Sequence, residues 1–165
     1  MTLRILSALI LALILTSLGV SANPKILVTG DQLPETVLPD QNGQTRNLEG
    51  ARLILFAQDK AAGEMIHAAL KDKTQEQLDA QGIVVISDIS RMPGLVARFI
   101  ALPSMRDYSY QILLGYAAGE TQWIPRKEDS VTRLTVQDGL ITGIDYAHSA
   151  EQLAGLITPD SANQP

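Results

Sequence analysis

The chain of 165 residues contains no cysteine. Without a thiol, neither disulfide exchange nor thiol-dependent peroxide reduction is available to it, and no disulfide can stabilise its fold. Aromatic residues are also scarce, at 4% of the chain, with a single tryptophan. Basic residues are outnumbered, 13 against 18 acidic ones, so the net charge is −5. An acidic chain lacks the basic surface that nucleic-acid binding needs, and we expect no nucleic-acid partner.

One long apolar run is present, and it lies at the N-terminus. Arg4 precedes the run ILSALILALILTSLGV, and Ser21 and Ala22 follow it. This order is typical of a secretory signal peptide that is cleaved after Ala22. The run is shorter than the roughly 20 residues that span a bilayer, which favours cleavage over an uncleaved anchor. We therefore expect residues 1–22 to be a signal peptide, the mature protein to be periplasmic, and no later segment to span a membrane.

The rest of the chain alternates apolar strands with amphipathic helices. Three continuous apolar runs predict strands that are buried on both faces, at residues 52–57, 83–87 and 110–116. We expect one helix over 60–80, capped by Asp59, and a second that begins at Ser90 and stops at Pro103. Each helix carries an apolar stripe that should face the sheet: Ile66, Leu70 and Leu78 on the first, and Leu95, Phe99 and Leu102 on the second.

The last part of the chain predicts a β-hairpin followed by a short helix. Residues 131–146 form the hairpin, with a tight turn at Asp138-Gly139. Ser149 and Gln152 form a capping box for the helix. The whole order predicts a three-layer α/β sandwich with a mixed central sheet and flanking helices.

We expect this sandwich to be a single domain. Residues 23–158 form it, and residues 159–165 form a disordered tail. A chain of this length can bury a hydrophobic core large enough to fold without disulfides or a structural metal.

The element order resembles the thioredoxin-like fold, especially its exported and peroxiredoxin-like branches. The lead-in LPETVLPDQNGQTRNLEGARLILFA is similar to that of thiol peroxidases and exported thioredoxins, and IVVISDIS and the QDG turn continue the likeness. The resemblance implies a Cys-x-x-Cys pair near residues 60–63 and a cis-proline just before a central strand. The chain has no cysteine, and the candidates for the proline position are Ser109 and Ser130. Both halves of the thiol site are therefore missing.

A narrower resemblance implies a different function. Residues 88–114, DISRMPGLVARFIALPSMRDYSYQILL, are similar to a small group of proteobacterial exported proteins labelled FAD/FMN-containing dehydrogenases. That label implies FAD or FMN as a cofactor. The chain has no glycine-rich dinucleotide motif after a strand, so we predict no cofactor and keep a flavin as the alternative.

Asp59, Lys60 and Glu64 lie at the strand–helix junction that carries the thiols in thioredoxin-like proteins. A helix N-terminus offers free N–H groups and a partial positive charge, which together favour an anion. The alternative is an ordinary capped helix with a solvated first turn.

Three arginines, Arg91, Arg98 and Arg106, flank or lie on the second helix. Arg91 and Arg98 are seven residues apart, share a helix face, and could together hold a carboxylate or phosphate. The alternative is surface pairing with Asp88 and Asp107.

The resemblance also implies where a ligand would bind. In thioredoxin-like proteins, substrates contact the start of the first helix and the loop before the cis-proline strand. With residues 105–109 as that loop, Arg106 and Tyr108 should lie beside Lys60, and the ligand should be anionic.

The segment 117–130 is the longest stretch without predicted structure, and it contains Trp123. Loops of this length are often functional, and an aromatic side chain near arginine suits a partner contact. The alternative is that Trp123 folds back on the sheet as a lid.

A metal site would need both histidines, His67 and His148. Their spacing is not helical, and the methionines that could assist copper, Met65, Met92 and Met105, more often fill core gaps. We therefore predict no metal ligands.

Together, these patterns predict an exported, cysteine-free binding module that catalyses nothing. Its partner would be a periplasmic protein or a small anionic ligand. The alternatives are a flavin-linked oxidoreductase or its accessory protein, and a periplasmic copper carrier.

Overall fold

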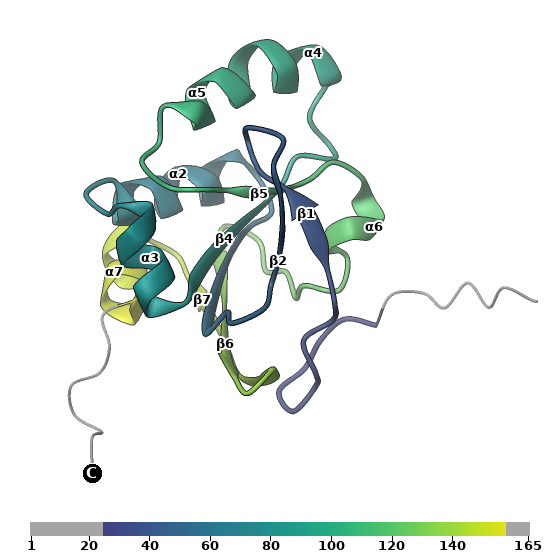
Figure 1. Ribbon diagram of the computed structural model, residues 1–165, viewed down its shortest axis with the longest axis vertical. Coiled ribbons are helices and arrows are strands. Elements are labelled where there is room, and N and C mark those ends of the chain that lie inside the picture. Colours follow the sequence, from purple (N-terminus) through teal and green to yellow (C-terminus); the bar gives the residue numbers. More distant parts are fainter. Residues whose placement is uncertain (1–24, 158–165) are drawn as a thin grey trace, which may run out of the picture.

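The computed structural model describes residues 25–157, so the expected signal peptide and tail lie outside the described residues. A five-stranded mixed sheet with the order β5-β4-β3-β6-β7 forms its centre (Figure 1). The strands are β3 (Leu53–Ala57), β4 (Ile83–Asp88), β5 (Leu113–Gly115), β6 (Val131–Gln137) and β7 (Leu140–Ala147). β3, β4 and β5 are parallel, β6 is antiparallel to β3, and β7 is antiparallel to β6. The predicted α/β sandwich with a mixed sheet is confirmed.

Helices pack on one face of this sheet. They are α2 (Lys60–Leu70), α3 (Gln75–Gln81) and α7 (Ala150–Ile157). The predicted stripe of Ile66, Leu70 and Leu78 is buried in this layer, each side chain at most 1% exposed. The prediction of one helix over 60–80 is wrong, because the chain breaks between α2 and α3. Thr74 there forms a capping box with Gln77, which satisfies backbone groups at the new helix start.

The N-terminal segment covers the other face. It contains the short hairpin of β1 (Val37–Pro39) and β2 (Thr45–Asn47), which crosses in front of the sheet in Figure 1. Leu38 and Leu48 from this segment pack with Phe56 and Leu134 of the sheet, and all four are buried. Both faces of the central strands are therefore covered, which explains their continuous apolar sequence.

The second predicted helix runs differently from the expectation. α4 (Gly94–Val96), a π-helical segment η2 (Ala97–Ala101) and α5 (Leu102–Arg106) follow one another without a break, and we call them the 94–106 helix. Ser90 does not cap it; the residue before it is Pro93, which makes no side-chain cap. Pro103 does not stop it either. In a regular α-helix, proline leaves one hydrogen bond unmade and clashes with the carbonyl four residues earlier. The π turn before Pro103 is wider than an α-helical turn, so the chain accommodates the proline there.

The predicted burial of Leu95 and Phe99 is also wrong, since they are 74% and 66% exposed. The wider turn changes the angular spacing of the side chains, so a 3.6-residue period does not describe this helix. Ala97 is its buried residue, and Leu102 and Met105 pack partly against the core.

The predicted strand at 110–116 is shorter in the structure, where β5 covers only Leu113–Gly115. The residues just before β5 form hydrogen bonds with the side chain of a glutamine and not with a neighbouring strand. The side chain of Gln41 donates to the carbonyl of Tyr110 at 2.8 Å and accepts from the N–H of Ile112 at 2.8 Å. Gln41 thus takes the place of a neighbouring strand, and the regular strand begins only at β5.

The topology decides between the two serines for the cis-proline position. Ser130 directly precedes β6, and β6 is hydrogen-bonded to β3. Ser109 precedes the edge strand β5 instead. Ser130 therefore takes the position before the central strand, and the loop before it is 125–130, not 105–109.

Candidate functional site

A cavity of about 230 Å³ opens between the start of α2 and the 94–106 helix. Ile66, Val85 and Ile112 line it from the core, and each is at most 5% exposed. Val96 and Ile100 line it from the 94–106 helix. Apolar side chains therefore reach the cavity from both sides, and it ends at the carboxyl edge of the parallel strands, where α/β proteins usually bind ligands.

Asp59, Lys60 and Glu64 all line the cavity, and they form a polar rim at its α2 side. Asp59 caps the helix as predicted, because its carboxylate accepts the N–H of Ala62 at 2.9 Å. Lys60 donates a hydrogen bond to Glu64 one turn along, and this bond raises the pKa of Lys60. One of the free N–H groups, that of Ala62, and the cation that would attract an anion are thus already partnered.

An aromatic cluster forms another part of the wall. Tyr108 and Tyr110 both line the cavity. The ring of His67 stacks on Tyr108 with centroids 3.8 Å apart, and its Nδ1 lies 3.3 Å from the Tyr110 hydroxyl oxygen. Burial raises the pKa of Tyr110, and the neighbouring Tyr108 raises it further. Tyr110 therefore stays neutral at physiological pH and serves as part of the wall.

The arginines do not gather at the cavity. The Arg106 Nε donates to the carbonyl of Gln41 at 3.0 Å, and Arg106 is not among the lining residues, although Tyr108 lines the cavity with Lys60. Arg91 lies in the turn before the 94–106 helix, so it shares no helix face with Arg98. The structure therefore builds no basic pocket from the predicted residues.

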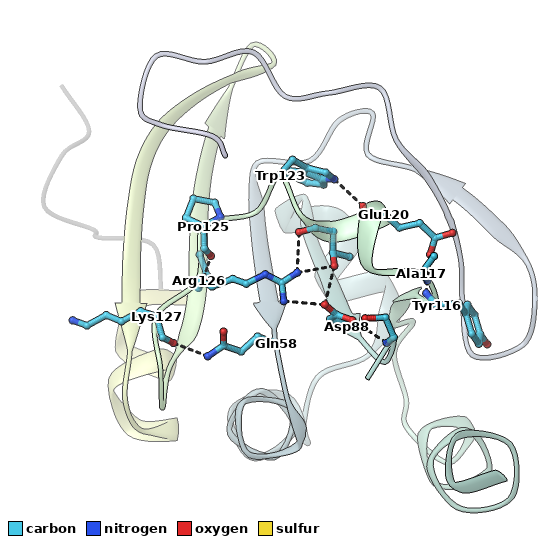
Figure 2. Close-up of polar contacts among 12 residues, drawn as sticks. Gln58, Asp88, Tyr116, Ala117, Glu120, Trp123, Pro125, Arg126 and Lys127 are labelled. Carbon is cyan, nitrogen blue, oxygen red and sulfur yellow. Dashed lines mark hydrogen bonds and ion pairs between the residues drawn. The ribbon is translucent and has the colours of Figure 1, made fainter. Parts of the chain in front are cut away.

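Trp123 is part of the core. It is 8% exposed and packs on the face of the sheet opposite α2, and its Nε1 donates to the carbonyl of Glu120 at 2.9 Å (Figure 2). Of the two interpretations of Trp123, its burial favours the one in which it folds back on the sheet as a lid. The segment 117–130 also contains a short helix, α6 (Ala118–Thr121), that the sequence did not indicate.

The buried Asp88, at the end of β4, forms an ion pair and hydrogen bonds with residues of the segment 117–130. Its carboxylate accepts from Arg126 Nη1 at 2.8 Å and from the Thr121 hydroxyl at 3.1 Å (Figure 2). The predicted surface pairing of Asp88 with arginines of the second helix is therefore wrong. Arg126 also lies over the ring of Phe56, 4.8 Å from its centroid.

The ionisation of Asp88 reflects these contacts. Burial works against the charged form and raises its pKa, but hydrogen bonds from Ser90, Arg126 and Thr121 outweigh burial and hold the pKa below its usual range. Asp88 lines the cavity as well. Sequence reasoning missed its role, because Arg126 lies 38 residues away and no local pattern links the two.

The histidines are engaged separately. His67 belongs to the aromatic cluster, and the Nδ1 of His148 donates to the carbonyl of Asp129 at 2.9 Å. Within residues 25–157, no three histidine or carboxylate side chains gather as a metal site would require.

The carboxylates that line the cavity are all engaged. Each carboxylate that lines it has a partner: Asp59 caps α2, Glu64 pairs with Lys60, and Asp88 pairs with Arg126.

Comparisons with known proteins identify the fold. No protein-family model matches the chain, and no curated protein matches it. A candidate protein disulfide isomerase from Bacteroides thetaiotaomicron superposes with a TM-score of 0.57 at 14% identity, covering 80% of this chain and 87% of that one. The peroxidoxin BcpB of Mycobacterium tuberculosis gives 0.51 at 16% identity, covering 78% and 92%.

A third solved structure agrees with these two. The thioredoxin domain of the thiol-disulfide oxidoreductase BVU-2223 from Bacteroides vulgatus gives a TM-score of 0.51 at 13% identity, covering 79% of this chain and 96% of that one. Similarity at this level of identity shows the fold alone. The chain has the thioredoxin-like fold, and it has it without a cysteine.

Proposed function

We propose that this protein is a non-catalytic binding module that holds a small, uncharged, apolar molecule in the cavity between α2 and the 94–106 helix. The observation that carries the proposal is the cavity itself, with apolar walls on both sides, at the carboxyl edge of the parallel strands. A concave apolar pocket with a few polar groups is the usual form of a small-molecule site.

The size of the cavity limits the ligand. An apolar cavity of about 150 Å³ accepts benzene, whereas pockets for drug-sized ligands have roughly 300 to 1,000 Å³. The 230 Å³ here suits one or two rings or a short branched chain. A flavin is larger than this, so no observation favours the flavin alternative.

The charges around the cavity argue against the anion that the sequence suggested. Lys60 is paired with Glu64, and Arg106 bonds to Gln41 outside the cavity. Asp88 is likewise paired, with Arg126, and the remaining charge on the wall, Asp59, is negative and would repel an anion.

The proposal places this binding outside the cytoplasm. Its support is the charged, apolar and small-residue order of residues 1–22, which is typical of export. No helix within residues 25–157 is long and apolar enough to cross a membrane.

A fluorescence titration with N-phenyl-1-naphthylamine tests the proposal. This uncharged aromatic probe brightens when it leaves water, so we expect its emission to rise and saturate with the protein. Ala101 lines the cavity, and Ala101→Phe should fill it and abolish the saturable signal. Ala68→Phe is the matched control, because Ala68 is exposed on α2 and does not line the cavity.

Thermal unfolding of both variants confirms that they are folded before the titration is read. The proposal fails if the wild-type protein gives no saturable signal, or if a folded Ala101→Phe variant binds the probe as the wild type does.

A further inference from the structure

The 94–106 helix exposes large apolar side chains, and two of them, Leu95 and Phe99, do not line the cavity. Leu95 is 74%, Phe99 66% and Ile100 65% exposed. With Val96, these make four of the nine large apolar side chains that are exposed within residues 25–157. Single exposed apolar residues are normal, but a group of them on one element marks an interaction surface.

Three arginines occur in the same segment of the chain, and the guanidinium of Arg98 lies 5.5 Å from the centroid of the Phe99 ring. Arg91, Arg98 and Arg106 are all exposed, and none of them forms an ion pair within the described part of the chain. Asp107 is the one acidic residue in the segment 90–107. This segment is therefore basic, although the whole chain has a net charge of −5.

The helix lies on the outside of the molecule. Figure 1 shows α4 and α5 at the top of the view, standing away from the sheet with the rest of the fold below. An apolar, basic, convex helix matches a surface that is negatively charged, soft and apolar just beneath its charges.

We propose that the 94–106 helix docks on an anionic lipid surface. Leu95 and Phe99 would enter the acyl region, while the three arginines contact the lipid phosphates. This role goes beyond the proposed ligand cavity and does not depend on it, because Leu95 and Phe99, the side chains that would enter the membrane, do not line the cavity.

Charge decides against a second copy of the chain. A symmetric dimer through this helix would bring the arginines of both copies together, and like charges in a self-complementary interface repel. A specific protein interface buries about 800 Å² on each partner, which is more than one helix of about 20 Å offers by itself. An anionic bilayer needs no such matched surface.

Two tryptophan variants test the proposal at the level of single positions. Phe99→Trp places a reporter on the docking helix, and Val37→Trp places one at an equally exposed position on β1, at 63% exposure in the wild type. We expect phosphatidylglycerol vesicles to shift the emission of the Phe99→Trp protein to shorter wavelength, and brominated acyl chains to quench it. Neither effect should occur with Val37→Trp. Both variants carry the same N-terminus, so binding through residues 1–22 cannot explain a difference.

The charge requirement is tested in the Phe99→Trp protein. Adding Arg98→Glu should weaken vesicle binding by about fivefold or more, while Lys71→Glu, an equal charge change at the exposed residue that follows α2, should not. Phosphatidylcholine vesicles should give no shift. An unchanged Phe99→Trp emission with phosphatidylglycerol would overturn the proposal, as would equal shifts with both lipids. A shift seen with an acidic protein but not with vesicles would assign the surface to a protein partner and overturn it too.

Discussion

Arg126 and Asp88 form an ion pair at the edge of the cavity, and the guanidinium bridges the Asp88 carboxylate and Thr121, an arrangement that we call the clasp. Nη1 donates to Asp88 at 2.8 Å, and Nη2 donates to the Thr121 hydroxyl at 2.9 Å and to the Thr121 carbonyl at 3.1 Å. The clasp ties the segment before β6 to the end of β4, and Figure 2 shows it with the hydrogen bond from Gln58 to the carbonyl of Lys127 beside it. Hydrogen bonds therefore hold the segment before β6 at two successive residues, Arg126 and Lys127.

Breaking the clasp at one partner should be costly. Arg126→Met leaves the buried Asp88 carboxylate without its cation, and we expect the free energy of unfolding to fall by about 3 to 5 kcal/mol. The double variant Asp88→Asn/Arg126→Met removes both charges and should recover part of this loss. Urea unfolding of the three proteins measures both values. Equal losses in the single and double variants would show that the charge of Asp88 is not what the arginine compensates.

The pKa of Asp88 gives the stability a defined pH dependence. Its pKa is lower in the folded protein than in the unfolded chain, so its contribution is present above the unfolded value of about 3.9 and is lost as the pH falls through the folded value. We therefore expect wild type and Asp88→Asn to differ most near pH 6, and the difference to shrink as the pH falls below the unfolded value of about 3.9 towards the lower, folded one. Urea midpoints across this range measure the difference, and a constant difference would contradict the assignment.

Gly63 gives a test of how open the cavity wall is. It lies inside α2, and a Cβ added there would have no atom within 4 Å. Gly63→Ala should therefore stabilise the protein by about 0.5 to 1 kcal/mol. Gly82→Ala is the control, because Gly82 has a φ of +66° and a Cβ there would lie 2.9 Å from Arg52 Nε; it should destabilise. Destabilisation by Gly63→Ala would mean that the wall is closed.

The orientation of the 94–106 helix can be tested through stability. Phe99 is 66% exposed, so Phe99→Ser should change the free energy of unfolding by no more than about 0.5 kcal/mol. Ile66→Ala, at a position 1% exposed, should cost about 2 to 5 kcal/mol. A loss at Phe99 as large as that at Ile66 would mean that Phe99 faces the core, as its sequence pattern suggested.

Sequence reasoning succeeded where the deciding interactions are local. Asp138 and Gly139 both have positive φ, 51° and 77°, as the Asp-Gly turn predicted, and Asp59 caps α2 as expected. The continuous apolar runs indicated strands that are buried on both faces. Hydrophobicity is a property of each residue by itself and does not depend on which residue it packs against. These features define the sheet and its order of elements.

It failed where distant segments decide. The Thr74–Gln77 capping box is a local signal for the break before α3. The apolar stripe that continues from Ile66 to Leu78 favoured a single helix instead. The helix continues through Pro103 because of a π turn that no residue pattern predicts. The clasp between Asp88 and Arg126 joins positions that are far apart in the chain. The cavity exists only because these segments meet, so its lining could not be predicted before the fold.

The measurement that tests the central claim most directly is a crystal structure of the protein with N-phenyl-1-naphthylamine. We predict that the rings of the probe lie between α2 and the 94–106 helix, in contact with Ile100 and Met105, which line the cavity. A probe that is ordered at another surface while this cavity stays empty would contradict the account.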